Sequence, residues 1–256
     1  MICKAKLSLP LALGVIVVAG ACIRSGWAQA VDSSPVATAT PATAPNPGDL
    51  DWLKAMSARG AYTYFVTTQD LNEDTKTGKF NVTHPHGRIV VVVGSATSTG
   101  DTPIDVKVSL DSVSPPVQAP LQLFMSKSGD LRVLTPIAPL RDNRDLFEIL
   151  LGINSIFYPR PGDDAKSAGD ALQWSGAAFP HTEYLDWRAV ADGKTITLSG
   201  LDITGDSPRD AVNDVAWVQT SDGIAFETSH TETQLIDGKA VSLEQINVFL
   251  QASPKQ

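Results

Sequence analysis

The chain has 256 residues and a formal net charge of −8 at pH 7, from 28 acidic and 20 basic side chains. A surface this acidic repels phosphate backbones and anionic lipid headgroups, so the composition argues against a nucleic-acid partner. The length is sufficient for a folded domain that buries its own core.

Residues 1–30 have the pattern of a signal peptide. Lys4 and Lys6 precede the apolar run Leu7–Ala21, and Ala28-Gln29-Ala30 offers the small residues that a signal peptidase recognises. The apolar run is shorter than the roughly 20 residues that a membrane-spanning helix needs. The sequence therefore predicts export to the periplasm, the cell envelope or the extracellular space.

Val18-Ala19-Gly20-Ala21-Cys22 resembles a bacterial lipobox, although Ala19 replaces the larger aliphatic residue usual in that motif. Two outcomes stay open. Cys22 is lipidated and becomes the only link to a membrane, or it is removed with the signal peptide. The other cysteine, Cys3, also lies in this segment, so we expect a mature fold without disulfides.

Residues 31–48 are rich in proline, alanine and threonine and are expected to form a disordered tether. The remaining residues 49–256 are predicted to form a single β-rich domain. Its two halves, 49–141 and 163–256, are expected to surround a central helix at 142–158.

In the first half, Asp49 is expected to cap a short helix, and Asn72–Gly78 is expected to be a polar turn. The uninterrupted valines of Arg88–Val93 predict a strand buried on both faces. Alternation of apolar and polar residues predicts a half-buried strand at Ile104–Leu110. Pro115, Pro116 and Pro120 are expected to break strand pairing. The strands expected in this half are Ala61–Thr68, Lys79–Thr83, Arg88–Val93, Ile104–Leu110, Leu121–Met125 and Leu131–Leu134.

Asp142–Gly162 is the most apolar segment with helical spacing outside the N-terminus. Leu146, Leu150 and Ile153 recur on one face of a helix, and Pro159 is expected to end it. A helix this apolar needs partners on its flanks, so it is predicted to be the shared core element of both halves.

The second half contains three Asp-Gly pairs, at 192–193, 222–223 and 237–238, between β-rich runs. Asp-Gly favours the positive φ angles of tight hairpin turns, so a meander of antiparallel strands is predicted. In the last strand the apolar positions change parity between Leu243 and Ile246, which predicts a bulge near Glu244-Gln245.

Together these elements predict a mainly β (α+β) fold, in which a curved antiparallel sheet, open barrel or sandwich surrounds one central apolar helix. The order of elements in the first half is similar to that in the open-barrel fold of periplasmic lipoprotein carriers. This order is a short helix, the strand Ala61–Thr68, and then Gly78-Lys79-Phe80 leading to His84-Pro85. Those carriers often have Arg-Pro at the last position. The resemblance covers about the first hundred mature residues.

Motifs for nucleophilic catalysis and for phosphate binding are absent, so no catalytic residue and no cofactor is predicted, and a non-enzymatic role is favoured. His84 and His86 are candidate metal ligands, the alternative being a polar turn around Pro85. Asp70-x-Asn72-x-Asp74 opens like a calcium loop but lacks the glycine and glutamate of that motif.

We expect an exported envelope protein that binds a hydrophobic small molecule or lipid, that is, an apolar or amphiphilic ligand. Two alternatives remain: a structural module that binds an envelope protein partner, and a carboxylate-based hydrolase. Aromatic and aliphatic residues of the first half and the central helix could line a ligand pocket or simply form core. The candidate ligand-binding residues are Tyr62, Tyr64, Phe124, Leu146, Leu150, Ile153 and Phe157.

Overall fold

The computed structural model describes residues 42–58, 60–74, 77, 79–127, 129–135, 140, 142–177, 184–204, 212–236 and 239–254. The predicted signal peptide, the lipobox at Cys22 and the tether up to residue 41 lie outside the described residues. Within the described residues, none of the helices has the length and apolar character needed to cross a membrane.

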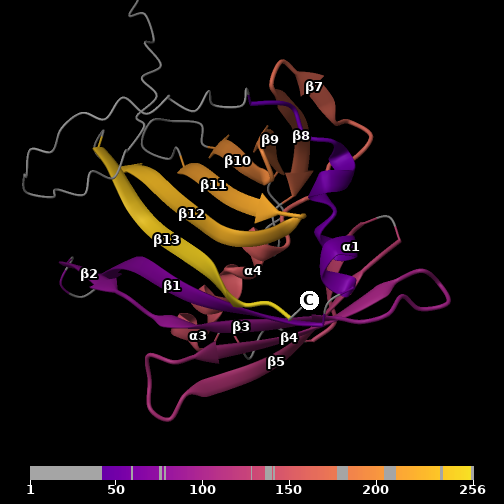
Figure 1. Cartoon of the computed structure of the whole chain (residues 1–256). Helices are drawn as coiled ribbons and strands as arrows, with labels where there is room; N and C mark the ends of the chain where they lie inside the picture. The colour runs from indigo at the N-terminus through magenta and orange to yellow at the C-terminus, as the bar shows by residue number, and fades with distance from the viewer. Residues whose placement is uncertain are drawn as a thin grey trace, which may run out of the picture. The chain divides into compact units, whose positions relative to one another are not determined.

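The described residues form a 13-stranded antiparallel sheet that is not closed (Figure 1), which confirms the predicted fold class. Its strands are β1 Ala61–Asp74, β2 Lys79–Thr83, β3 His86–Val93, β4 Thr102–Leu110, β5 Val117–Met125, β6 Leu131–Val133, β7 Lys166–Ala168, β8 Ala171–Ala177, β9 Tyr184–Asp192, β10 Thr195–Thr204, β11 Val212–Ser221, β12 Ile224–Ile236 and β13 Lys239–Ala252.

The first and last strands of the chain pair with each other at the middle of this sheet. The order is β6-β5-β4-β3-β1-β13-β12-β11-β10-β9-β8-β7, and β2 pairs with the far end of β1. Apart from the β1–β13 and β1–β3 pairs, the neighbours along this path are consecutive in the chain. The two predicted halves are therefore joined through β1 and β13.

One side of the sheet, called here the inner face, packs against the central helical segment. In β1, Tyr62, Tyr64 and Val66 are fully buried, and in β13 Ile246 and Val248 are buried. Residues that alternate with them are partly or fully exposed, as the period of two in a strand requires. The opposite side is called the outer face.

The central helix is present as two short pieces, α3 Arg144–Leu151 and α4 Ile153–Ile156. Both contact the sheet, α3 at β1, β3, β4 and β13, and α4 at β11 and β12. A Cβ atom on Gly152, between them, would lie 3.1 Å from Val248 Cγ2 and 3.3 Å from Val66 Cγ1. A glycine at this position lets the segment approach the sheet closely.

The prediction that Arg88–Val93 is buried on both faces is wrong. Ile89, Val91 and Val93 are buried, but Val90 is half-buried and Val92 is 39% exposed. The side of β3 that carries Val92 is open to solvent. The valine run therefore reflects the preference of β-branched residues for strands, not burial.

Three further local predictions need correction. Asn72–Gly78 is not all turn, because β1 continues to Asp74 and pairs with β2 up to the Asp74–Lys79 pair. The helix α1 (Trp52–Ser57) is capped by Asp51, whose side chain accepts from Lys54 N–H, while Asp49 belongs to a preceding 3-10 turn. Pro120 was expected to break strand pairing, but it lies inside β5 and stands opposite Lys107 of β4. It lies outside the part of β5 that pairs with β6, which is limited to Leu123–Met125.

The meander of the second half is confirmed. Asp222, Gly193 and Gly223 adopt the positive φ angles expected of their turns, whereas the third Asp-Gly pair lies outside the described residues. The register between β12 and β13 shifts so that Glu232 faces Glu244 and Thr233 faces Ser242. The predicted bulge is thus present one residue earlier, at Leu243.

Candidate functional site

Six of the seven candidate ligand residues come together in one hydrophobic core. Tyr62 and Tyr64 of β1 and four residues of the helical segment are at most 4% exposed there: Leu146, Leu150, Ile153 and Phe157. Phe124 is not with them, because it alternates with the buried Leu123 and Met125 and faces the other side of β5. Whether the six contact a ligand stays a prediction.

This core contains polar atoms that have no hydrogen-bond partner within the described residues. Glu148 Oε2 and Asn154 Oδ1 come from the helical segment, and Tyr64 OH and Thr228 Oγ1 come from the sheet. The four residues are between 0% and 8% exposed. A buried polar atom without a partner costs roughly 1–3 kcal/mol, so the helix–sheet interface is not an optimised apolar contact.

Acidic side chains form a single row across the inner face. Each member lies directly opposite the next in the register of neighbouring antiparallel strands, so the side chains share one face. The row, called here the acidic row, consists of Asp70 in β1, Glu244 in β13, Glu232 in β12, Asp214 in β11 and Asp202 in β10.

The acidic row has basic partners near both of its ends. Arg144 of α3 places Nη2 2.6 Å from Asp70 Oδ2, and His230 Nε2 lies 3.2 Å from Asp214 Oδ1. Arg144 also lies 3.7 Å from Glu148 Oε1, one helical turn further along α3. Asp70 is 5% exposed, while the other four acids of the row are half-buried. The row is thus accessible along most of its length.

Glu148 reaches from α3 to the acidic row and forms a hydrogen-bonded carboxyl pair with Glu244. Burial, followed by repulsion from the Glu148 carboxylate, raises the pKa of Glu244 to about 9. Burial also raises the pKa of Glu148, an effect that Glu244 and Arg144 oppose only in part. The pair therefore holds a proton at neutral pH, and this proton links the helix to the sheet.

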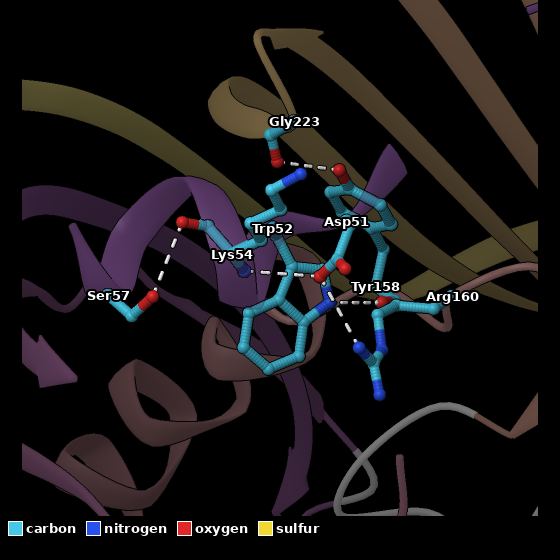
Figure 2. A network of polar contacts seen from close by, with 7 residues as sticks. All are labelled: Asp51, Trp52, Lys54, Ser57, Tyr158, Arg160 and Gly223. Atoms are coloured by element: carbon cyan, nitrogen blue, oxygen red, sulfur yellow. Dashed lines mark hydrogen bonds and ion pairs between the residues drawn. The ribbon is translucent and has the colours of Figure 1, made fainter. Parts of the chain in front are cut away.

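A second polar network anchors the other end of the helical segment (Figure 2). Trp52 Nε1–H donates to Tyr158 O at 2.8 Å, and Tyr158 O–H donates to Gly223 O at 2.6 Å. Arg160 Nη1 lies 3.3 Å from Asp51 Oδ1, the oxygen that caps α1. The exit from α4 is thereby tied both to α1 and to the β11–β12 turn.

Tyr158 and Tyr64, both fully buried, provide a matched test of this anchor. Tyr158→Phe is expected to lower the free energy of unfolding by about 1–2 kcal/mol, because it leaves the carbonyl of Gly223 without its donor. Tyr64→Phe removes a hydroxyl without a hydrogen-bond partner in the described residues, so it should be neutral or slightly stabilising. Urea unfolding measures both, and equal losses would contradict the assignment.

The predicted metal ligands lie elsewhere. His84 and His86 are exposed on either side of Pro85 and line an open pocket of about 390 Å³ with Phe65. Among the described residues, no group of three or more His, Cys, Asp or Glu side chains could hold a metal ion. Asp70 and the residues up to Asp74 lie in a strand, which does not wrap around a calcium ion.

Two further surface pockets flank α1, with volumes of about 550 and 470 Å³, and both include Asp51 and Lys54. None of the three described pockets is lined by Glu148, Glu244 or a candidate ligand residue. The carboxyl pair has the raised pKa that a hydrolase would need, but these pockets do not bring a substrate to it.

Comparison with known proteins adds no identity: no protein-family model and no curated protein matches the chain. The candidate site is therefore defined by its residues alone. Sequence reasoning missed the acidic row, because its members come from five strands. The alternation of residues within each strand could have placed these acids on the inner face. Their alignment into a row follows only when the register between the strands is known.

Proposed function

We propose that the protein is a non-enzymatic binding protein of the cell envelope that takes up an amphiphilic ligand between the inner face and the α3–α4 segment. The N-terminal signal pattern supports export, and the apolar core around α3–α4 supports an apolar ligand body. The observation that carries the proposal is the set of buried polar atoms without partners at this interface.

Those atoms favour an amphiphilic ligand over a purely apolar one. Tyr64 OH and Thr228 Oγ1 lie on the sheet side, and Asn154 Oδ1 lies on the helix side. A ligand with polar groups near its apolar body would give these atoms hydrogen-bond partners. The described residues of the α3–α4 segment give them none. Because this segment fills the space against the sheet, the ligand must displace it in part.

A disulfide that locks the segment to the sheet tests this requirement. Gly152 is placed for it, since a Cβ atom there would lie 3.1 Å from Val248 Cγ2. The variant carries Gly152→Cys and Val248→Cys, with Cys3→Ser and Cys22→Ser to remove the two native thiols. Binding is followed by the fluorescence of the neutral dye N-phenyl-1-naphthylamine and by its displacement with dodecylmaltoside.

We expect the reduced variant to bind the dye and the oxidised variant to bind it at least about tenfold more weakly, with full recovery after dithiothreitol. The wild-type chain, treated with the same oxidant, is the control and should not change. Equal binding by the oxidised and reduced forms would place any ligand elsewhere, and a wild-type chain that binds neither probe would refute the proposal.

A further inference from the structure

The open pocket between the β2–β3 turn and the outer face lies apart from the α3–α4 segment, and it is called here the outer pocket. Its volume of about 390 Å³ is within the roughly 300–1,000 Å³ usual for small-molecule sites. The turn forms its wall. Its floor consists of outer-face side chains of β1 and β13, namely Phe65, Thr67, Gln69, Gln245 and Asn247.

The polar side chains of the floor are placed together by the register of β1 and β13. Thr67 lies opposite Asn247, and Gln69 lies opposite Gln245. All four are half-buried, and none has a hydrogen-bond partner among the described residues. Carboxamides and hydroxyls both donate and accept hydrogen bonds, so the floor offers unused groups of both kinds.

The wall of the outer pocket is fixed by hydrogen bonds of its backbone. Pro85 O accepts from Thr68 N–H at 2.9 Å and from Thr68 Oγ1 at 3.4 Å, and His86 O accepts from Asp111 N–H at 2.9 Å. The His86 ring lies 6.1 Å from the Phe65 ring, between centroids, with the planes tilted by 52°. A ligand therefore meets a wall that is already ordered, which lowers the cost of binding.

The outer pocket offers no fixed charge to a ligand. None of the described residues that line it is Asp, Glu, Lys or Arg. Arg88 lies opposite Phe65 in β3, but its Nε is 2.7 Å from Asp111 Oδ2, so its charge is already paired. Moving an ion out of water without a counter-charge is costly, so the lining favours an uncharged ligand.

The position of the outer pocket in the sheet argues against a peptide ligand. Extended peptides commonly bind by adding a strand to a free sheet edge. Here β1 and β13 lie in the middle of the sheet, with neighbouring strands on both sides. Their backbone groups are used in those pairs, so a ligand must be recognised by side chains. This favours a compact molecule that carries many hydroxyl groups.

We propose that the outer pocket binds a pyranose ring of a neutral saccharide. The C–H groups on one face of the sugar pack against Phe65, because the face of an aromatic ring carries partial negative charge. The hydroxyls at the edge of the sugar exchange hydrogen bonds with the carboxamides and the Thr67 hydroxyl. The pocket lies on the outer face, so this inference does not depend on the proposed function.

Two matched sugars distinguish the sources of such a ring. Cellotriose and N,N′,N″-triacetylchitotriose have the same β-1,4 linkage and differ in the acetamido group on each ring. The first represents saccharides with hydroxyl groups alone, and the second represents N-acetylated ones. Binding of each to the full chain is measured by calorimetry at millimolar sugar.

The variant Gln69→Ala/Gln245→Ala removes two carboxamides from the floor. Its matched control is Gln173→Ala/Gln219→Ala, which makes the same substitutions on the outer face of β8 and β11, away from the pocket. We expect the affinity for the bound sugar to fall about tenfold or more in the pocket variant and to change less than about twofold in the control.

Phe65→Ala tests the aromatic surface separately. Its control is Phe249→Ala, since Phe249 lies directly opposite Phe65, is 38% exposed and does not line the pocket. We expect a loss of affinity of about tenfold or more for Phe65→Ala and of less than about twofold for Phe249→Ala. Circular dichroism verifies that all four variants fold, and the glutamine variants decide alone if Phe65→Ala does not.

Binding of both sugars with this variant pattern supports recognition of the pyranose ring itself. Binding of one sugar alone with the same pattern supports the proposal and assigns the source, N-acetylated for the chitotriose and unsubstituted for cellotriose. Absence of binding by both sugars, or equal losses in the pocket variants and their controls, overturns the proposal.

Discussion

Replacing Leu150 with alanine is expected to lower the free energy of unfolding by about 3 kcal/mol. Leu150 is 1% exposed in the middle of α3 and belongs to the core that α3 shares with the sheet. Truncation removes buried apolar surface and leaves a cavity, because the sheet on one side and the helix backbone on the other cannot both collapse into it. Chemical denaturation followed by circular dichroism measures the loss.

Leu201→Ala is the matched control, since it makes the same chemical change on β10, where the side chain is 45% exposed. We expect a loss of less than about 1 kcal/mol there. If the two variants unfolded alike, the α3–α4 segment would not be the shared core element of the two halves, and the proposed ligand site beneath it would lose its basis.

The central role of this segment is predictable from local sequence. The spacing of Leu146, Leu150 and Ile153 marks one face of a helix, and the flanking strand patterns leave it as the apolar element available for packing. The close approach of Gly152 to the sheet is not predictable in the same way. It brings Gly152 against Val66 and Val248, and both are distant in sequence.

The sequence also predicts where the strands lie, but it predicts less well which of their faces are buried. The Asp-Gly pairs at 192–193 and 222–223 identify two turns of the second half, and the parity change in β13 identifies the bulge to within one residue. The valine run of β3 misleads, because β-branched residues favour strands whether or not both faces are covered. Whether a face of a strand is buried depends on the elements that pack against it, and the sequence of the strand alone does not specify them.

The acidic row shows the same limit at the candidate site. Glu232 and Glu244 face each other only because the bulge at Leu243 restores the inward parity of Glu244. A register one residue different would turn these carboxylates to the outer face and dissolve the row. Sequence identifies acidic residues and a bulge, whereas the row is a product of pairing between strands.

Replacing Glu244 with glutamine is expected to stabilise the protein at alkaline pH and to have little effect near pH 5. The Glu244 carboxyl group has a pKa of about 9 in the folded protein and an ordinary value of 4.5. Between these values the folded state holds a proton that the unfolded state has lost, so stability falls as pH rises. Glutamine keeps a donor for Glu148 without a charge that must be neutralised.

Burial is the main cause of the raised pKa of Glu244, and the carboxyl groups that face it act in the same direction. Glu148 of α3, Glu232 of β12 and Asp70 of β1 raise this pKa by repulsion. Arg144, which pairs with Asp70 and Glu148, acts in the opposite direction on the pKa of Glu148. One pKa unit corresponds to about 1.4 kcal/mol, so we expect wild-type stability to decline by roughly 4 kcal/mol from pH 5 to pH 8 and the decline to be much smaller in Glu244→Gln.

Urea unfolding at each pH measures both curves, with Glu227→Gln as the control on the exposed side of β12. The control should follow the wild-type curve, because Glu227 is exposed. A Glu244→Gln curve parallel to wild type would mean that Glu244 is ionised in the folded protein at neutral pH. The proton shared by Glu148 and Glu244 would then not exist.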